Sequence, residues 1–173
     1  MFEKSEDELM NQESRIAYIP KLQVEGDLAT EDFGMLVTTH RLIFVNTKKT
    51  YLTTVGMVYD HLKNPKEAID IATVDLNQLC QMKHNFGIWN TQLAKFSMKK
   101  KFLCYRLVIH YTNEYGNVKK VKSDVLVPSD FALFMRKEGK KGKEIDQEYA
   151  NIVRNALLKA APPQAATASE WPI

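Results

Sequence analysis

The sequence is poor in the residue patterns that build metal and disulfide sites. Its two cysteines, Cys80 and Cys104, show neither CxxC spacing nor any other paired arrangement. Four histidines are scattered along the chain without an H-x-x-x-H pair: His40, His61, His84 and His110. Structural zinc sites need such ligands at short, defined spacings. We therefore predict no metal site and no disulfide, and reduced thiols are typical of a cytosolic protein.

Phosphate-binding loops and nucleophile signatures are lacking as well. The seven glycines form neither a G-x-G-x-x-G fingerprint nor a P-loop, and there is no serine elbow or cysteine–histidine signature. A catalytic triad can also assemble from residues far apart in the chain, which a single sequence does not reveal. The patterns predict a non-catalytic protein that uses no cofactor.

Long hydrophobic runs are missing too. No stretch approaches the roughly 18 apolar residues of a membrane-spanning helix, and the acidic N-terminus has no apolar core of a signal peptide. We therefore expect a cytoplasmic protein whose membrane contact is peripheral. The 173 residues, 45% of them hydrophobic, are enough for one domain with a substantial core.

Charge is present but unevenly distributed. The formal net charge is only +3, yet acidic residues crowd positions 3–32, whereas residues 95–122 carry eight basic side chains against Glu114 alone. Such a distribution predicts an electrostatically polarised molecule.

Lysine clusters at residues 99–101, 119–122 and 136–143 allow three interpretations. They can keep edge strands and loops soluble, or bind anionic lipid headgroups, where each lysine contributes about 1 kcal/mol. Nucleic acid is not the expected partner, because single-strand binding favours aromatic platforms interleaved with arginine. The lipid-binding candidates are Lys99, Lys100, Lys101, Lys119, Lys120 and Lys122.

Residues 34–46 read GMLVTTHRLIFVN and predict a β-hairpin. Two apolar runs, residues 35–37 and 42–45, have the β-branched and aromatic side chains of strands, and a short polar turn joins them. The second run is apolar throughout, which indicates a strand buried on both sides. Gly34 eases the approach of the chain to the first strand.

This hairpin resembles a motif of the pleckstrin-homology (PH) superfamily in its GRAM and GLUE branches. Those families carry Gly-x-Leu-x-x-Thr-x-Arg-Leu-Ile followed by an aromatic residue. The positions that match are Gly34, Leu36, Thr39, Arg41, Leu42, Ile43 and Phe44. The motif resembles most the GLUE domain of the membrane-binding subunit of the ESCRT-II sorting complex.

The resemblance covers about residues 15–160 and implies an α+β, mainly β, fold. We expect a PH-like small barrel of two packed antiparallel sheets, capped by a C-terminal amphipathic helix. The implied function is that of an adaptor in an ESCRT-like membrane-sorting machinery. Its implied partners are anionic membrane lipids, including phosphoinositides, ubiquitin or a ubiquitin-like protein, and other sorting-complex subunits. The alternative is a PH-like protein-interaction domain with no lipid affinity.

Strands account for most of the remaining chain. Pro20 suits an edge or a bulge better than a central strand. The other expected strands cover residues 15–24, 51–59, 68–79, 103–111 and 118–126, and residues 84–93 are expected to form a turn. Strict alternation predicts one core-facing set: Leu103, Tyr105, Leu107, Ile109 and Tyr111.

Residues 145–160 show the apolar spacing of an amphipathic helix, with Ile152 and Val153 on its core stripe. Ser5 and Glu8 fit a capping box for a short N-terminal helix, and residues 129–135 fit either a helical turn or a last strand. We divide the chain into an N-terminal extension (1–14), a PH-like domain (15–160) and a flexible tail or linker (161–173), because residues 161–173 lack periodicity.

Two apolar groups are candidates for binding proteins or membranes. Phe86, Ile88 and Trp89 either complete the core beneath their turn or form a membrane wedge or protein-binding patch. Leu158 lies about 100° round the helix from Leu157. With Phe131 and Met135, Leu158 forms a candidate ubiquitin-binding patch, unless these residues cover one another within the domain.

Overall fold

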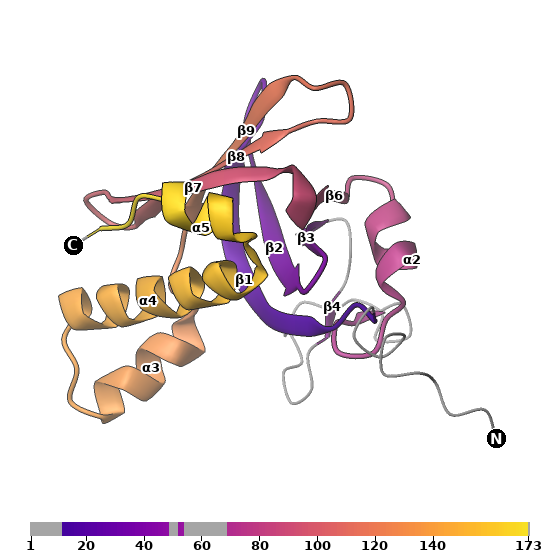
Figure 1. The fold of residues 1–173 in the computed structure, drawn as a ribbon. Helices are drawn as coiled ribbons and strands as arrows, with labels where there is room; N and C mark the ends of the chain where they lie inside the picture. The colour runs from indigo at the N-terminus through magenta and orange to yellow at the C-terminus, as the bar shows by residue number, and fades with distance from the viewer. Residues whose placement is uncertain (1–11, 49–51, 54–68, 173) are drawn as a thin grey trace.

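A computed structural model describes residues 12–48, 52–53 and 69–172 of the chain (Figure 1). The main antiparallel sheet contains seven strands: β1 (Arg15–Glu25), β2 (Thr30–Thr38), β3 (Arg41–Asn46), β6 (Phe86–Trp89), β7 (Leu93–Lys100), β8 (Tyr105–Thr112) and β9 (Val118–Val125). The remaining elements are short strands β4 (Leu52–Thr53) and β5 (Ile69–Asp70), helices α2 (Leu76–Gln81), α3 (Ser129–Lys137), α4 (Gly142–Ala160) and α5 (Pro163–Ala168), and the 3-10 turn η2 (Asn90–Gln92).

The sheet consists of two meanders, β1-β2-β3-β6 and β7-β8-β9, in the order β6-β3-β2-β1-β9-β8-β7. Only β1 and β9 join them, through the pairs Leu22–Val125, Gln23–Asp124 and Val24–Ser123. Strands β6 and β7 are consecutive in the chain but not neighbours in the sheet, so the sheet is not closed. Two antiparallel meanders with a helix at their open corner are what the PH-like prediction requires, and that prediction is confirmed.

The predicted hairpin is confirmed as β2 and β3, joined by Thr39 and His40. The hydroxyl of Thr38 organises the turn, because its Oγ1 accepts hydrogen bonds from the backbone N–H groups of His40 (3.2 Å) and Arg41 (2.9 Å). The same hydroxyl donates to the Glu13 carboxylate at 2.6 Å. Threonine at this position therefore closes the turn and fastens residue 13 to it.

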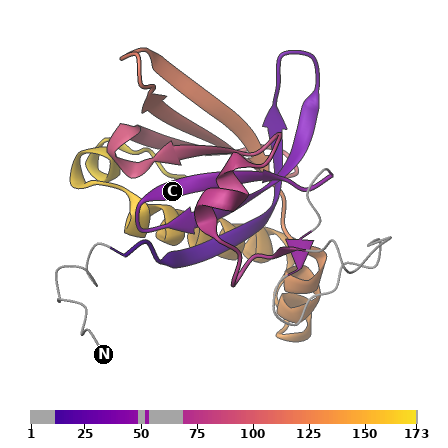
Figure 2. The ribbon, with the colours of Figure 1, turned by 90° about the vertical axis from the view of Figure 1, so that its right-hand side faces the viewer.

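Both faces of β3 are buried, as its unbroken apolar run predicts. One face of the hairpin enters the main core through Met35, Val37, Leu42 and Phe44. The opposite face forms a second cluster that α2 covers: Leu36, Ile43, Val45, Ile71, Leu76 and Leu79. In Figure 2, α2 lies in front of the strands of the first meander. Each fully buried Leu, Ile or Phe contributes roughly 1.5–3 kcal/mol.

Helix α4 packs against β1 and β2 at the open corner of the sheet (Figure 1). Its buried stripe is Ile145, Tyr149, Ala150, Val153, Ala156, Leu157 and Ala160. The placement of Val153 is confirmed, but Ile152 is 46% exposed, so its assignment to the stripe is wrong. Adjacent helical residues point about 100° apart, and the helix turns Val153 rather than Ile152 toward the sheet.

Two short elements differ from the sequence-based expectation, and a third decides between two alternatives that the sequence left open. Residues 68–79 contain only the two-residue strand β5 before the chain turns into helix α2, whose N-terminus is capped by the Asp75 carboxylate. Residues 84–93 are not simply a turn, because β6 pairs with β3. Residues 129–137 resolve as helix α3, preceded by Pro128. The predicted helix at Ser5 and most of the predicted strand at 51–59 lie outside the described residues.

The C-terminal segment was expected to be a flexible tail, but the structure differs from this expectation. Residues 163–168 form α5, which packs on β7. The chain then runs beside β7, where Glu170 exchanges backbone hydrogen bonds with Phe96 and Met98 at 2.9 Å each. The Trp171 ring lies 6.0 Å from the Phe96 ring and packs against the core. Residues 169–171 thereby cover part of the β7 edge.

Two backbone positions predicted to be special have clear structural reasons. The register of β1 shifts between Ile19 and Leu22, which places Pro20 in a bulge and confirms that alternative. Gly34 lies inside β2 rather than at its approach, and the Tyr18 ring crosses directly over it. A side chain at position 34 would occupy the space of that ring, so the motif glycine serves a close contact.

Candidate functional site

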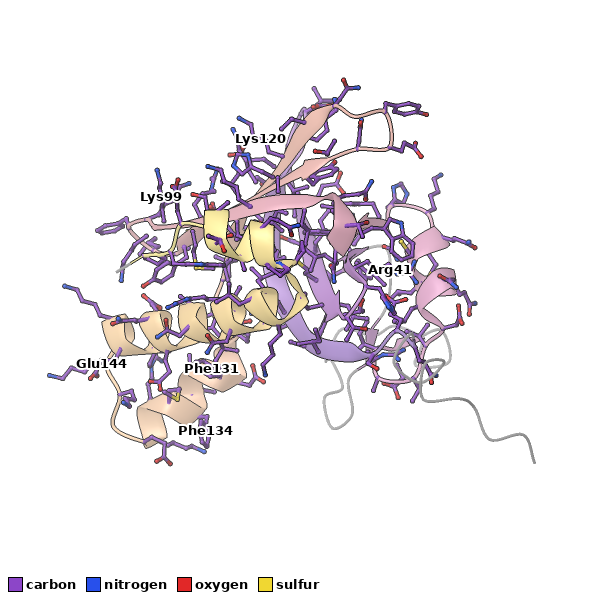
Figure 3. All side chains as sticks on the ribbon, in the orientation of Figure 1. Arg41, Lys99, Lys120, Phe131, Phe134 and Glu144 are labelled. Carbon is purple, nitrogen blue, oxygen red and sulfur yellow. The ribbon has the colours of Figure 1, made fainter. Side chains whose placement is uncertain are left out.

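The outer face of the second meander carries a cross-strand array of basic residues. Sheet register places Lys99 beside Arg106, Lys122 beside Val108, and Lys120 beside His110. Figure 3 shows Lys99 and Lys120 at different heights on this part of the molecule. These side chains are exposed or half-buried, so a ligand can reach them.

The six candidate lysines do not all share this face. Lys100 and Lys119 pair with Tyr105 and Tyr111, whose side chains have the opposite orientation in the sheet. The Lys100 ammonium lies 5.4 Å from the centre of the Tyr105 ring, a cation–π contact. Lys101 follows the end of β7. The six candidate lysines therefore lie at three places: the outer face, the β7–β8 turn and, for Lys119, the opposite face near the β8–β9 turn.

Carboxylates neutralise part of the basic array. Arg106 binds Asp124 in a bidentate manner and also binds Glu25, while Lys101 lies 3.5 Å from Asp124. Lys122 lies 3.4 Å from Glu25. Among the carboxylates of the described residues, none forms an ion pair with Lys99, Lys100, Lys119 or Lys120. Those four charges remain available to a ligand.

The ion pairs of Arg106 shift the pKa values of Arg106 and Asp124. The hydrogen bond to Asp124 and the one to Glu25 raise the pKa of Arg106 against the effect of burial. Burial is the largest single influence on Asp124 and raises its pKa, but the hydrogen bond and charge of Arg106, with Lys101, lower the pKa below its ordinary value. Asp124 is thus held in its carboxylate form, which fixes the position of the Arg106 side chain.

His110 sits among these cations. Burial lowers its pKa most, and the charges of Lys95 and Lys120 lower it further, with Glu170 opposing them. Lys95 lies 3.5 Å from the Glu170 carboxylate. The imidazole therefore favours its neutral form on a face that already carries several positive charges.

The turn between β7 and β8 carries two exposed apolar side chains. Phe102 is 94% exposed and Leu103 is 80% exposed. The assignment of Leu103 to the core is wrong, because β8 begins only at Tyr105 and the turn closes with a hydrogen bond from the Lys101 N–H to the Cys104 carbonyl (2.8 Å). The assignments of Tyr105, Leu107 and Ile109 to the core are confirmed.

The aromatic segment of β6 mostly completes the core. Ile88 is fully buried, and the Phe86 ring stacks on Phe44 with centroids 4.6 Å apart. Trp89 is 47% exposed, and the Arg41 guanidinium lies 4.6 Å from its ring centre. Ile88 is therefore not accessible as a binding residue, whereas part of Trp89 is.

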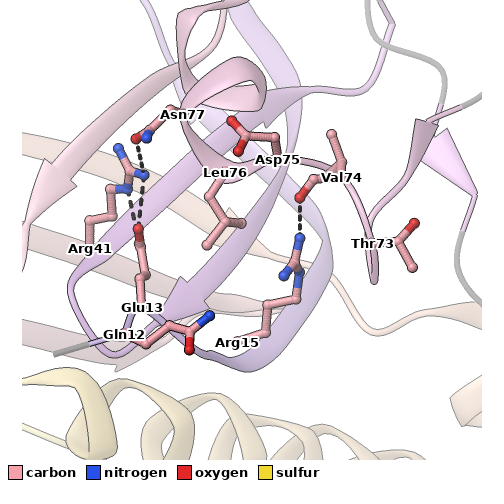
Figure 4. Close-up of a pocket in the computed structure, with 9 residues that line it drawn as sticks. All are labelled: Gln12, Glu13, Arg15, Arg41, Thr73, Val74, Asp75, Leu76 and Asn77. Carbon is pink, nitrogen blue, oxygen red and sulfur yellow. Dashed lines mark hydrogen bonds and ion pairs between the residues drawn. The ribbon is translucent and has the colours of Figure 1, made fainter. Parts of the chain in front are cut away.

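Arg41 is a structural hub beside a cavity of about 340 Å³ (Figure 4). Its buried guanidinium binds the Glu13 carboxylate (2.9 Å) and the Asn77 side-chain oxygen (2.6 Å). On the cavity's other side, Arg15 donates to the carbonyls of Ile71 and Val74. Both arginines thus bind protein groups, and they tie β1 and β3 to the segment around α2.

Helix α3 separates its apolar residues between two sides. Phe131 packs on Tyr149 of α4 with ring centres 5.2 Å apart, and Met135 is buried. The exposed apolar residues are Leu133 and Phe134. Figure 3 shows Phe131 between α3 and α4 and Phe134 on the side of α3 away from α4.

A groove of about 470 Å³ runs between α3 and the start of α4. Leu133, Ile145 and Val127 contribute apolar atoms to it, and Arg136 and Asp146 contribute charge. Leu158, the third member of the predicted ubiquitin patch, is half-buried on α4. Phe131 and Met135 are mostly taken up by packing within the domain, so sequence reasoning missed Leu133 and Phe134 as the exposed pair.

The two cysteines of the described residues are poorly suited to nucleophilic chemistry. Burial raises the pKa of the Cys80 and Cys104 thiols, which reduces their nucleophilic thiolate form. Within the described residues, no three His, Cys, Asp or Glu side chains come together as a possible metal site. In the same part of the chain, no helix has both the length and the apolar character needed to cross a membrane.

One sequence signal was available for the exposed turn. In the structure, β7 ends at Lys100 and β8 begins at Tyr105, so residues 101–104 form a hairpin turn. A side chain in such a turn cannot continue the alternation of a strand. The run of three lysines that directly precedes Phe102 also marks exposed chain.

No protein-family model matches this sequence, and no curated protein matches it. Several solved structures are similar in fold. One is the N-terminal PH domain of Vps36, with a TM-score of 0.39 and 14% identity over 82% of this chain and 82% of that one. Another is the hSac2 domain of the human phosphoinositide phosphatase Sac2, with a TM-score of 0.44 and 10% identity over 92% of this chain and 87% of that one. These are remote likenesses in fold, and neither supplies a binding residue to this chain.

Proposed function

We propose that this PH-like domain is a non-catalytic adaptor that binds anionic phospholipid headgroups, phosphoinositides among them, at the cytoplasmic surface of membranes. The observation that carries the proposal is that, whereas Lys101 and Lys122 have ion-pair partners, four of the six candidate lysines of the second meander have none among the described residues: Lys99, Lys100, Lys119 and Lys120. Two of them precede the β7–β8 turn and two lie on β9. In this role the domain would bring a sorting complex of the ESCRT type, through its other subunits, to a membrane.

The distribution of charge on this surface favours binding of anionic lipid over the alternative that the lysines only keep the protein soluble. A solubilising surface mixes both signs of charge, and here Asp124 and Glu25 are already bound to Arg106. An approaching anionic surface therefore meets lysine ammonium groups that need not break an ion pair first. Each lysine near such a surface contributes about 1 kcal/mol.

Co-sedimentation with vesicles tests the proposal. The vesicles contain phosphatidylcholine alone, phosphatidylcholine with phosphatidylserine, or phosphatidylcholine with a phosphoinositide. Reversing Lys99, Lys100 and Lys101 to Glu should weaken binding to anionic vesicles about 100-fold or more, from about 1 kcal/mol for each lysine, and added salt should weaken wild-type binding. Binding that tolerates both salt and the reversals would refute this surface as the lipid site.

A matched control separates local from global charge. Lys21, Lys48 and Lys83 are exposed and belong to β1, the end of the hairpin and the segment after α2. Reversing these three to Glu changes the net charge by the same amount and should leave vesicle binding nearly unchanged. Absence of wild-type binding to every anionic vesicle would favour the alternative function, a PH-like protein-interaction domain with no lipid affinity.

Ubiquitin or a ubiquitin-like protein is a second candidate partner, favoured by the exposed pair Leu133 and Phe134 on α3. A small apolar patch with a polar rim suits weak, transient association. Titration of isotope-labelled protein with ubiquitin should shift resonances of α3, and Leu133→Ser with Phe134→Ser should abolish these shifts. An unchanged spectrum at high micromolar ubiquitin would exclude this partner.

A further inference from the structure

We propose that the β7–β8 turn is a membrane-inserting wedge, in which Phe102 and Leu103 enter the outer acyl region of an anionic bilayer while the preceding lysines hold its headgroups. The proposal rests on the proposed function, since it specifies how the same surface would engage lipid. In this proposal Phe102 and Leu103 insert into the bilayer, a contribution to binding that the lysine charges do not make.

The geometry of the turn presents both side chains to solvent. Phe102 and Leu103 occupy the middle of a four-residue connection, closed by the hydrogen bond between Lys101 and Cys104. The flanking strands pair from Lys100–Tyr105 back to Leu93–Tyr111, with one register shift between Leu93 and Lys95. In Figure 1 this turn projects from the left-hand side of the molecule, beyond the β7 label. A paired β-hairpin thus carries an apolar tip.

The size of the apolar patch argues against a stable protein interface at this turn. Stable protein interfaces bury about 800 Å² on each side around a packed apolar centre, whereas here two side chains stand alone at a tip. A bilayer needs no complementary pocket, because a tip reaches its acyl boundary by passing between headgroups. Long lysine side chains can follow such a tip and keep their ammonium groups at headgroup level.

Charge distinguishes this turn from the exposed turns that carry Leu28 and Tyr115. Leu28 in the β1–β2 turn is also fully exposed, but Asp27 adjoins it and an anionic surface would repel that carboxylate. Tyr115 in the β8–β9 turn is exposed beside Glu114. At the β7–β8 turn, three successive lysines precede the apolar pair. Apolar tip and positive charge therefore coincide there.

A second basic region lies on the same side of the molecule. The α3–α4 loop and the start of α4 appear at the left of Figure 1, as the β7–β8 turn does. This region carries Arg136, Lys137, Lys140, Lys141 and Lys143 against Glu138 and Glu144, and Lys140 lies 3.7 Å from the Glu148 carboxylate. A flat anionic surface placed against that side would meet both regions, so the wedge fixes an orientation of the domain as well as an attachment.

Fluorescence on vesicles of phosphatidylcholine with phosphatidylserine tests insertion directly. Phe102→Trp adds an indole at the tip, and Leu28→Trp adds one at the acidic control turn, each against the background of native Trp89 and Trp171. The Phe102→Trp protein should show a blue shift and quenching by acyl-brominated lipid beyond that of the wild type. The Leu28→Trp protein should show neither change beyond the wild type.

Affinity provides the second readout. Phe102→Ser with Leu103→Ser should lower vesicle partitioning about tenfold or more and leave the salt dependence unchanged, because the lysines remain. Circular dichroism should show an unaltered fold, since both side chains are exposed. Leu28→Ser should partition like the wild type.

The outcomes separate the wedge from the function on which it rests. No wild-type binding to anionic vesicles overturns the lipid proposal and the wedge together. Wild-type binding that depends on Lys99, Lys100 and Lys101, with no extra quenching of Phe102→Trp and no loss for the serine variant, overturns the wedge alone.

Discussion

Replacing Gly34 with alanine tests the close contact beneath Tyr18. A methyl group at position 34 would lie 2.1 Å from the Tyr18 hydroxyl oxygen and 2.6 Å from its Cζ atom. These separations are far inside van der Waals contact, so the ring has to move. Tyr18 packs on the cluster that contains Leu36 and Val45, and full burial of an aromatic side chain is worth about 1.5–3 kcal/mol. Losing part of that burial should destabilise the protein by about 1–2 kcal/mol.

A double-mutant cycle measured by urea unfolding checks this reasoning. The four proteins are the wild type, Gly34→Ala, Tyr18→Ala and the double variant. Once the ring is absent, Gly34→Ala should become neutral or stabilising, because glycine in a strand costs about 0.5–1 kcal/mol relative to alanine. The sign of the alanine effect should therefore change with the background. An equal loss of stability in both backgrounds would show that the ring contact is not the reason for glycine.

Two further predictions concern the second meander. Leu107→Ala should lower the free energy of unfolding by about 2–5 kcal/mol through lost burial and a cavity, whereas Leu103→Ala, the same change on the exposed turn, should cost less than about 0.5 kcal/mol; equal thermal stabilities of the two variants would contradict the core assignment. The pKa of His110, followed by NMR, should lie below its ordinary value and rise in Lys120→Gln. Because the folded pKa is lowered, the contribution of His110 to stability is present above the unfolded pKa of about 6.5 and is lost as the pH falls through the folded pKa; a folded pKa at or above 6.5 would contradict the burial and the neighbouring charges.

Local sequence patterns were enough to predict most of the long elements of the fold, but strand β7 (Leu93–Lys100) was not predicted. The β2–β3 hairpin, strands β8 and β9 and helix α4 each repeat their apolar pattern over several turns or pairs, so a sequence window contains the whole signal. Short elements were missed for a physical reason. Helix α2 has six residues and α5 has six, and helices of that length form through tertiary packing rather than through their own propensity.

The candidate site was only partly predictable. Runs of lysine identify exposed positions, but which lysines are neutralised depends on Asp124 and Glu25, which sheet pairing brings beside Arg106. The exposure of the β7–β8 turn was missed because Leu103, two residues before the start of β8, fits the apolar alternation of that strand. On α3, the periodicity was too short to show which apolar residues face α4. Such errors arise where long-range pairing decides exposure.

The segment after α5 has a consequence for self-association. An uncovered edge strand offers backbone groups to any strand from another molecule. At β7, Glu170 exchanges hydrogen bonds with Phe96 and Met98, and Ser169 also accepts from the Phe96 N–H. Residues 169–171 of the same chain thus occupy these backbone groups, and this intramolecular pairing does not depend on protein concentration. Edge-to-edge pairing with another molecule at Phe96 and Met98 would require residues 169–171 to detach, so its rate would follow that opening equilibrium.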